Sequence, residues 1–595
     1  MKTEPVPEIS VIVSALREAP EFALDLETTG FDPHNDFIRG MSLSIGMRPN
    51  QTWWIPFRGP GAVPFVSTMR ELAPVLSDPK KIMVGSNPKF DLKFLRVNGV
   101  TVTCRVADTI VADWLLDENN RKHGLKEVVS REFGVTMVDY KEASKRVDDL
   151  FGDGKFERYA KDDARYALKL WKTLNARLKK EGLDILYWRV EMRVLRVLIE
   201  MELAGVHIDI PHLKNMQAEF SAKMAASLKG AYEAVGHEFD VSSPKQVSAV
   251  LFDELKLPIQ PGEVRGKAGY YSTDDRILTC YNHPVVKAIL RHRTVSKLMG
   301  TYINPYIEKT RDTLRIFTEF RQAGTRAGRF TSVEPNLQQI PSKKSLRGTI
   351  KKMFIPAPGK LFLCGDFNQL QFRLIGHYCK CVLGRSIISD LYQEAGSDLH
   401  EKTNLELKLT DRKRAKTVNF AFLFGRGAKS FAEAEHMDQG VADNYYNGFH
   451  FSYPEIRQMA DYCRNEICTK GYIESIGGRR RRFPEAKGKD PRSREVWWMG
   501  WVAWNACIQG SESDLVRLVM ANLWEDILAR RKKEDHWDEV SIILQVHDEL
   551  VLEAPPIIAC DVMDLMRLHA TKAMALKVPI SMDVGVGMDW EESKA

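Results

Sequence analysis

Two short stretches, far apart in the chain, each place an aspartate at the end of an apolar run. Residues 360–373 (KLFLCGDFNQLQFR) contain Asp366, and residues 541–553 (SIILQVHDELVLE) contain Asp548. The apolar runs predict strands, and the second continues into another run, which predicts a hairpin with Asp548 at its tip. Carboxylate oxygens are ligands that hard divalent cations prefer. If the two aspartates lie close together in the fold, the pattern predicts a site for two divalent cations about 3.5–4 Å apart, which would assist phosphoryl transfer.

The length and composition of the chain limit the kind of protein that it encodes. Its 595 residues imply several domains, because single cores rarely grow past about 250–300 residues. The net charge of +7 permits a polyanionic partner, although a mildly basic enzyme is the simpler interpretation. No apolar run reaches the roughly 20 residues that span a bilayer, and the N-terminus lacks a secretion-signal pattern. The nine cysteines form no CxxC pair, so we expect a reducing, cytoplasmic location, in the host cytoplasm if the protein is phage-encoded.

The first third of the chain carries a spaced set of acidic residues. An apolar run (EFALDLETT) contains Asp25 and Glu27, and residues i and i+2 of a strand face the same side, so both carboxylates can address one metal ion. Asp91 follows, and Tyr159 and Asp163 share a face if they lie on a helix. Each element alone is common and usually faces water. Together and in this order they are far more specific.

This set resembles the three motifs of the proofreading 3′–5′ exonucleases, in the tyrosine variant of the DEDD superfamily. The resemblance covers roughly the first 185 residues and implies an RNase H-like mixed sheet with helices. It also implies that four carboxylates hold two Mg²⁺ ions, for which Mn²⁺ can substitute, while Tyr159 helps to position the attacking water. The implied ligands are Asp25, Glu27, Asp91 and Asp163.

A helix with a cationic and aromatic face is predicted in residues 411–425 (DRKRAKTVNFAFLFG), which end at a glycine. Arg412, Lys416 and Phe420 are spaced by four, so each is rotated by only about 40° from the last. Cations bind phosphates, and an aromatic face can stack on a base. Taken alone, the pattern is better interpreted as an amphipathic helix with a basic edge. The two strand-end aspartates favour a nucleotide-binding helix.

Together these segments resemble the family A DNA polymerases, the group of bacterial polymerase I and phage replicative enzymes. Residues 366–373 match motif A, residues 412–425 match motif B in the fingers, and residues 545–549 match motif C. The resemblance covers essentially the whole chain and includes no 5′-nuclease domain. It implies an α/β and α+β multidomain fold, with an RNase H-like exonuclease domain and a right-hand polymerase. The expected domains are the exonuclease domain (1–185), the thumb (186–310), the first part of the palm (311–395), the fingers (396–495) and the second part of the palm (496–595).

The resemblance implies a mechanism of two-metal phosphoryl transfer. Asp366, Asp548 and the backbone carbonyl of Phe367 would hold two Mg²⁺ ions, one activating the primer 3′-hydroxyl and the other binding the triphosphate. Arg412 and Lys416 would neutralise the phosphates.

Further residues are expected to contact the substrates. His400 would help to neutralise the phosphates, and Glu549 belongs to motif C, with its role as a ligand left open. The residues expected to contact the incoming dNTP are Gln369, Gln371, His400, Arg412, Lys416, Phe420 and Phe424. Those expected to contact template–primer DNA are Arg329, Asn505 and Gln509 on the minor-groove side and His547 near the primer-terminal phosphate.

Two positions depart from the family pattern. Members usually carry glutamate where this chain has Gln371, and tyrosine where it has Phe424. In typical members this glutamate and this tyrosine lie close together and can form a hydrogen bond. Gln371 and Phe424 cannot form that bond in the same way, so the two changes can be coupled. Glutamine has nearly the bulk of glutamate, so we expect ribonucleotide rejection to persist through shape. Phe420 implies discrimination against dideoxynucleotides, which tyrosine relaxes in the family.

The leading hypothesis is therefore a DNA-templated DNA polymerase with proofreading, acting as a monomer on template–primer DNA. A phage-type replicative enzyme is favoured over a cellular repair polymerase, and a processivity partner stays open. A single-subunit RNA polymerase is disfavoured by the exonuclease set and Phe420. An exonuclease with an inactive polymerase half is disfavoured by Asp366, Asp548, Arg412 and Lys416, and a non-enzymatic DNA-binding module is weaker still.

Overall fold

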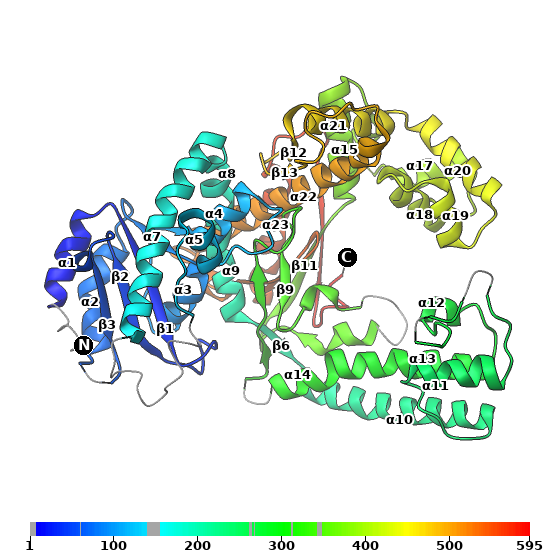
Figure 1. Cartoon of the computed structure of the whole chain (residues 1–595), viewed down its shortest axis with the longest axis horizontal. Helices are drawn as coiled ribbons and strands as arrows, with labels where there is room; N and C mark the ends of the chain where they lie inside the picture. The colour runs from blue at the N-terminus through cyan, green and yellow to red at the C-terminus, as the bar shows by residue number, and fades with distance from the viewer. Residues whose placement is uncertain are drawn as a thin grey trace.

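The computed structural model places an N-terminal domain beside a larger region in which long helices surround a four-stranded sheet (Figure 1). The structure describes residues 8–59, 61–139, 155–260, 264–266, 268–310, 313–341, 348–394 and 396–594. Within these ranges, no helix has the length and apolar character that crossing a bilayer requires.

The N-terminal domain is built on a five-stranded mixed sheet in the order β3-β2-β1-β4-β5. The central strand β1 pairs antiparallel with β2 and parallel with β4, as expected for an RNase H-like sheet. The strands are β1 (Glu21–Thr28), β2 (Ile38–Ser44), β3 (Thr52–Pro56), β4 (Ile82–Gly85) and β5 (Arg105–Asp108). The helices include α1 (Ile9–Glu18), α2 (Phe65–Leu76), α3 (Pro88–Val97), α4 (Thr109–Leu116), α5 (Leu125–Phe133) and α7 (Lys155–Glu181).

A helical segment follows the N-terminal domain. Helix α9 (Met192–Ala204) packs against the central sheet and ends at Gly205, whose positive φ of 58° favours glycine. Two long helices, α10 (Ile210–Val235) and α13 (Pro284–Leu298), then pack against each other and form the arm expected for a thumb. Shorter helices of this segment are α8 (Asp184–Leu186), α11 (Pro244–Ser248), α12 (Asp275–Leu278) and α14 (Asn304–Lys309).

The central sheet has the order β14-β15-β11-β16, and all its neighbours run antiparallel. Residues from two distant parts of the chain therefore form one sheet, as a palm split by an insertion requires. Its strands are β11 (Leu361–Phe367), β14 (Ser541–Val546), β15 (Glu549–Ala554) and β16 (Met582–Gly587). Helix α23 (Ala559–Lys572) packs against β11 and β16, and α22 (Arg494–Arg530) packs against both α23 and α15 (Leu370–Leu383). Short strands elsewhere are β6 (Val206–Ile208), β7 (Arg315–Ile316), β8 (Glu319–Arg321), β9 (Thr331–Val333), β10 (Phe354–Ile355), β12 (Tyr472–Glu474) and β13 (Arg480–Arg482).

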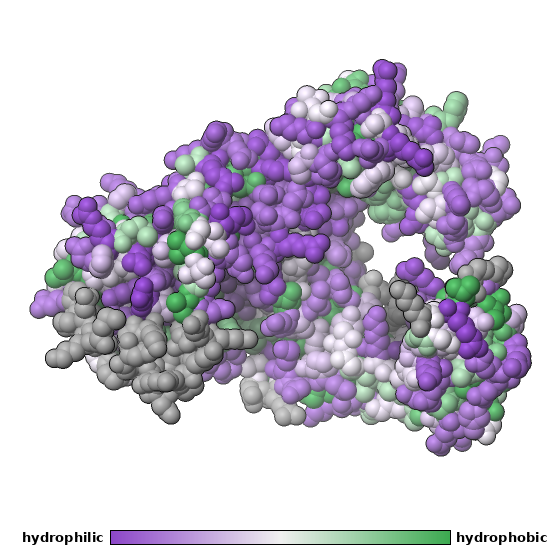
Figure 2. All heavy atoms as spheres, in the orientation of Figure 1, coloured by the Kyte–Doolittle hydropathy of each residue, from purple (hydrophilic) through white to green (hydrophobic). Residues whose placement is uncertain are grey.

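The insertion between the two parts of the central sheet is helical, as expected for fingers. Helix α18 begins after Asp411, whose side chain accepts a hydrogen bond from the Arg414 amide, and Gly425 with φ 84° follows its end. A deep notch separates this helical insertion from the α10–α13 arm (Figures 1 and 2). The helices are α16 (Ile387–Leu391), α17 (Leu399–Leu407), α18 (Arg412–Leu423), α19 (Ala428–Glu435), α20 (Gln439–Ser452) and α21 (Glu455–Lys470).

A buried ionic cluster joins Glu191, in the segment that follows the N-terminal domain, to helix α22 and to the chain just before β13. Arg479 binds Glu191 and Asp514 at 2.5 and 2.6 Å, and Arg517 lies 3.5 Å from the same glutamate. Burial opposes ionisation of Glu191, but the guanidinium groups of Arg517 and Arg479 outweigh it and lower its pKa. The neighbouring strand β13 adds Arg482, which binds carboxylates of the N-terminal domain.

We expect Glu191→Ala to destabilise the fold strongly, because it leaves two buried arginines without their shared carboxylate. The expected loss is about 3 kcal/mol, whereas Glu200→Ala at an exposed ion pair with Arg96 should cost less than about 1 kcal/mol. The midpoint of urea denaturation measures both. Equal midpoints for the two variants would contradict the importance of the buried cluster.

Candidate active sites

The first candidate site is a carboxylate cluster in the N-terminal domain. Strand β1 presents Asp25 and Glu27 on one face, and helix α7 brings Asp163 beside them. Ligand oxygens of these three residues lie within 4.8 Å of one another. The convergence predicted from the strand pair and the Tyr-x-x-x-Asp element is therefore observed.

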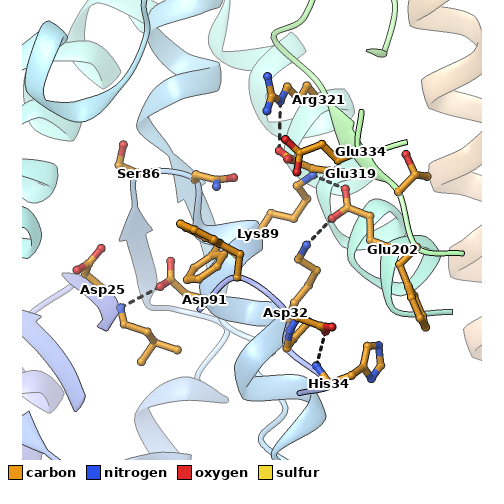
Figure 3. A pocket seen from close by; sticks show the side chains of 18 of the residues that line it. Asp25, Asp32, His34, Ser86, Lys89, Asp91, Glu202, Glu319, Arg321 and Glu334 are labelled. Carbon is orange, nitrogen blue, oxygen red and sulfur yellow. Dashed lines mark hydrogen bonds and ion pairs between the residues drawn. The ribbon is translucent and has the colours of Figure 1, made fainter. Parts of the chain in front are cut away.

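Asp91 occupies a second position behind this cluster, on helix α3 (Figure 3). Its Oδ1 accepts a hydrogen bond from the Leu26 amide at 2.9 Å, which ties the carboxylate to the middle of β1. The negative charge of Asp91 acts on Asp25 and helps to raise its pKa. Asp91 therefore interacts electrostatically with the cluster, although its oxygens lie outside the group formed by Asp25, Glu27 and Asp163.

Tyr159 lies one helical turn before Asp163, as the spacing predicted. Its side chain is buried, and the negative charge of Asp163 adds to burial in raising the pKa of the Tyr159 hydroxyl. The ammonium group of Lys126 lies 4.8 Å from the centre of the Tyr159 ring. These contacts hold the hydroxyl at the edge of the carboxylate cluster, where it can orient a water molecule.

The electrostatics of this cluster fit a divalent cation. Burial, together with the neighbouring carboxylates, raises the pKa of Asp25 well above its ordinary value and that of Glu27 to about 8. Burial also raises the pKa of Asp91 to about 8 and that of Asp163 to about 6. In addition, Asp163 Oδ1 is buried without a hydrogen-bond partner. An unpaired oxygen among mutually repelling carboxylates is the donor set that Mg²⁺ or Mn²⁺ would stabilise.

We expect binding of Mn²⁺ to this cluster to release protons and to tighten as the pH rises towards about 8. The folded pKa values of Glu27 and Asp91 lie above those of the unfolded chain, so the metal-free fold keeps protons that the unfolded chain has lost. Its stability therefore falls as the pH rises from about 4 to about 8, and a cation must displace these protons. Calorimetric titration with Mn²⁺ at pH 6 and pH 8, in buffers of different ionisation enthalpy, measures both effects. The variant Glu27→Gln should release fewer protons, and equal affinity at the two pH values would contradict the expectation.

A cavity of about 800 Å³ opens in front of the cluster and is shared between the N-terminal domain and the central region. Lys89 extends into this space from α3 and binds Glu202, while Arg321 and Glu319 come from the chain beyond residue 313 (Figure 3). The cavity thus has carboxylates at one end and alternating charges at the other. It is open and large enough to admit the end of an extended ligand.

The second candidate site is the aspartate pair of the central sheet. In the register of β11 and β15, Asp366 lies opposite Glu549, and the Phe367 amide donates to the Asp548 carbonyl at 3.3 Å. The two aspartates, 182 positions apart in the sequence, are thus neighbours at one edge of the sheet. The hairpin with Asp548 at its tip is confirmed.

The two aspartates influence one another electrostatically. Burial, followed by the charge of Asp366, raises the pKa of Asp548 to about 7. Partial desolvation and the charge of Glu549 also raise the pKa of Asp366. Two carboxylates that resist ionisation at the same sheet edge fit a divalent cation, with the Phe367 carbonyl as a further candidate oxygen ligand.

The backbone beside each aspartate is held in the left-handed region. Gln369 has φ 50° and His547 has φ 58°, an uncommon conformation for residues other than glycine. The side chain of Gln369 accepts a hydrogen bond from the Tyr392 hydroxyl at 2.5 Å. Strained positions of this kind cluster at functional sites, where surrounding contacts over-determine them.

The structure shows the contacts of Glu549, whose role as a ligand the sequence left open. Its carboxylate is buried and binds Lys594 Nζ at 2.6 Å and the indole nitrogen of Trp590. These contacts anchor the C-terminal segment to β15.

A cavity of about 430 Å³ opens at the end of β11, where Asp366 lines it and Asp548 does not. Asp366, Gln369 and Arg412 line it together, although they come from different elements. It also contains Asp583, which lies opposite Asp366 in the β11–β16 register and was missed in the sequence analysis. The alternation in MDVGVG, residues 582–587, is the signal that could have exposed this residue.

One residue of the predicted face of α18, Arg412, lines this cavity, whereas Lys416 and Phe420 line a second cavity of about 880 Å³ along the same helix. Arg412, Lys416 and Phe420 are all exposed, and the Arg412 guanidinium binds Asp398 at 2.5 Å. Phe420 packs on Phe372 with ring centres 5.0 Å apart, which connects the helix to α15. Two cations and an aromatic ring therefore lie on one surface.

His400, which is expected to help neutralise the phosphates, stays a predicted contact of the incoming dNTP. The ring is buried and its Nδ1 lies 2.9 Å from the Asn419 amide nitrogen. Burial lowers its pKa to about 4, so the imidazole is neutral near pH 7. In this state His400 can offer a hydrogen bond.

The remaining predicted contacts lie around helix α22. Arg329 and Gln371 both donate to the carboxylate of Glu512, at 2.6 and 3.0 Å. Gln371 therefore bonds to α22, and its partner is not Phe424, which stacks on Phe420 with centres 6.3 Å apart. The other predicted contacts are Asn505, which donates to the Phe424 carbonyl at 3.1 Å, Gln509, which lies one turn before Glu512, and His547, which lines a small cavity with Arg329.

Comparison with known proteins adds an independent line of evidence. A family model described as 3′–5′ exonuclease matches residues 6–179, and one described as DNA polymerase family A matches residues 210–592. DNA polymerase I of Chloroflexus aurantiacus is 30% identical over 98% of this chain and 62% of its own length. DNA polymerase I of Borreliella burgdorferi is 27% identical over 98% of this chain and 64% of its own length. The chain therefore spans about three fifths of the length of these relatives.

A solved structure supports the fold. The POL domain of Pol1 from M. smegmatis, in a complex with DNA primer-template and dNTP, superimposes with a TM-score of 0.85 at 24% identity. The match covers 99% of this chain and 99% of that one. The likeness shows that the complete arrangement of N-terminal domain, arms and central sheet is shared.

Proposed function

Because the chain belongs to DNA polymerase family A, we propose that it extends primer 3′ ends on a DNA template and removes nucleotides from the same ends. The observation that carries this proposal is the meeting of Asp366 and Asp548 at one sheet edge, beside the cationic face of α18. The carboxylate cluster of the N-terminal domain supports the second activity.

In synthesis, the aspartate pair would bind metal ions and helix α18 would bind the nucleotide. Asp366, Asp548 and the Phe367 carbonyl would hold Mg²⁺, which supplies charge stabilisation for the reacting oxygens when bound. Arg412 and Lys416 bind the triphosphate, and Phe420 offers a flat surface to the nucleotide. Release of the Arg412–Asp398 ion pair frees the guanidinium for a phosphate. Catalysis of this kind rests on positioning and charge stabilisation.

The N-terminal site performs hydrolysis with its own residues. Asp25, Glu27, Asp91 and Asp163 would hold the cations, and the Tyr159 hydroxyl, close to Asp163, orients water toward the scissile phosphate. The adjoining cavity of about 800 Å³ receives the single-stranded 3′ end. We also propose that the domains meet at residues 185, 310, 395 and 495.

One assay tests the proposed function. The purified chain is incubated with a labelled primer–template in Mg²⁺, with and without the four dNTPs. Template-directed lengthening with dNTPs and shortening without them is the expected result, and EDTA should abolish both. Failure to lengthen the primer would overturn the synthetic activity, and shortening alone would favour a nuclease with an inactive polymerase half.

We expect Phe420→Tyr to increase incorporation of dideoxynucleotides relative to dNTPs by at least about tenfold. Phe420 is 42% exposed and lines the cavity of about 880 Å³ along α18, so we expect a tyrosine hydroxyl there to supply a polar partner near the sugar that phenylalanine lacks. Phe424→Tyr is the matched control, because it adds the same group one turn later. The ratio of kcat/KM values for ddNTP and dNTP measures the effect. Equal incorporation of both substrates by the unaltered chain would contradict it.

Two biological roles, replication and repair synthesis, fit the proposed polymerase activity. The relatives described above are bacterial DNA polymerases I. Phage-type replication, predicted from the sequence, stays a prediction alongside cellular repair synthesis. We propose that the chain acts as a monomer on template–primer DNA.

A further inference from the structure

Glu512 is a buried carboxylate beside the central site, and the functions proposed so far do not use it. It lies on helix α22 with only 2% of its surface exposed. A single oxygen, Oε2, accepts from both Arg329 Nη2 and Gln371 Nε2, at 2.6 and 3.0 Å. A buried carboxylate is costly unless it is paired, so these two donors account for its presence.

The identity of residue 371 follows from this contact. An amide at position 371 can donate its NH₂ group to Glu512, whereas a carboxylate there would face the Glu512 oxygen at about the observed separation of 3.0 Å. Two like charges at that distance, one of them buried, repel strongly. Gln371 and Glu512 are therefore a matched pair, in which the amide is needed because the carboxylate lies on α22.

We propose that Glu512 is a positioning residue of the synthetic site, holding the sugar-facing Gln371 and the minor-groove-facing Arg329 in fixed relation through one carboxylate oxygen. The inference rests on the proposed polymerase function. Because both donors share the same acceptor, displacement of one changes the position available to the other. Glu512 thereby links recognition of the nucleotide sugar to recognition of the terminal base pair.

The surroundings of Glu512 agree with this role. The residue lines a small cavity with Arg329, Gln338, Gln545 and His547, next to the hairpin that carries Asp548. Its negative charge contributes to the raised pKa of Asp548. Arg329 Nε is buried without a hydrogen-bond partner, so Glu512 is the group that fixes the guanidinium.

A charge-exchange experiment tests the proposal in the full chain carrying Asp25→Ala, so that degradation does not obscure extension. Four forms are compared on one primer–template: the Asp25→Ala chain, Gln371→Glu, Glu512→Gln, and Gln371→Glu with Glu512→Gln. The measurements are kcat and KM for a dNTP and for the matching rNTP, together with the melting temperature. Glu525→Gln is the control on the same helix, where the exposed carboxylate binds Arg193.

We expect Gln371→Glu to lower kcat/KM for the dNTP by about tenfold or more, and the double variant to recover to within about threefold of the starting chain. Glu512→Gln alone should lower the dNTP-to-rNTP selectivity ratio by about tenfold, whereas Glu525→Gln leaves it unchanged. Additive losses in the double variant, or changes in melting temperature without any change in the ratio, would overturn the proposal. Absence of extension by the unaltered chain would overturn the proposed function as well, so the two failures are distinguishable.

Discussion

Asp548→Asn should lower primer extension by about 1,000-fold or more while leaving 3′-end degradation within about twofold of the unaltered chain. The substitution preserves size but removes one of the two charges that meet at the edge of the central sheet. Asp366 cannot compensate, because it is one carboxylate at the end of β11, whereas Asp548 supplies its own from the turn between β14 and β15 at the same sheet edge. Rates of single-nucleotide addition under single-turnover conditions measure the loss.

Asp564→Asn provides the control for this prediction. Asp564 lies on α23, is largely exposed and binds Arg567 three residues later. Its loss should leave extension unchanged within about twofold. Near-normal extension by Asp548→Asn, or an equal loss of degradation, would show that Asp548 does not act at a separate synthetic site.

Asp25→Asn should produce the opposite result, lowering degradation by about 1,000-fold while sparing extension. Asp25 is one of three residues whose oxygens lie within 4.8 Å, so its neutralisation removes a central part of the charge that would hold a cation. Release of labelled nucleotide from a single-stranded 3′ end measures the effect.

A control on the same strand separates charge from folding. The control variant is Glu21→Gln. Glu21 lies at the start of β1 and accepts a hydrogen bond from the Trp171 indole at 3.2 Å, a bond that glutamine can preserve. This variant should degrade DNA at the normal rate. If Asp25→Asn degrades equally well, the carboxylate cluster is not the hydrolytic site.

Much of the central site could be predicted because its chemistry lies on regular elements. The apolar run before Asp366 predicted β11, and the paired runs around Asp548 predicted a hairpin, since alternation and run length report directly on strands. The four-residue spacing of Arg412, Lys416 and Phe420 likewise placed them on one helix face. These features depend on local backbone geometry, which the sequence encodes directly.

The features that escaped prediction all depend on long-range pairing. Asp583 enters the site only because β16 pairs beside β11, and Glu512 is significant only because α22 brings it to Gln371 and Arg329. The neutral state of His400 depends on burial between α17 and α18, which sequence spacing does not reveal. Single-sequence patterns specify neither sheet neighbours nor the desolvation of a side chain.

We propose that Asp366 and Asp548 hold the same divalent cation, and the number of Mn²⁺ ions that the chain binds tests this most directly. Electron paramagnetic resonance can count bound Mn²⁺ in a chain carrying Asp25→Ala and Glu27→Ala, with further Asp366→Asn, Asp548→Asn, or both. We predict that either substitution abolishes the same binding site and that combining them causes no further loss. Survival of the site in either single variant, or separate losses that add in the double variant, would contradict the claim.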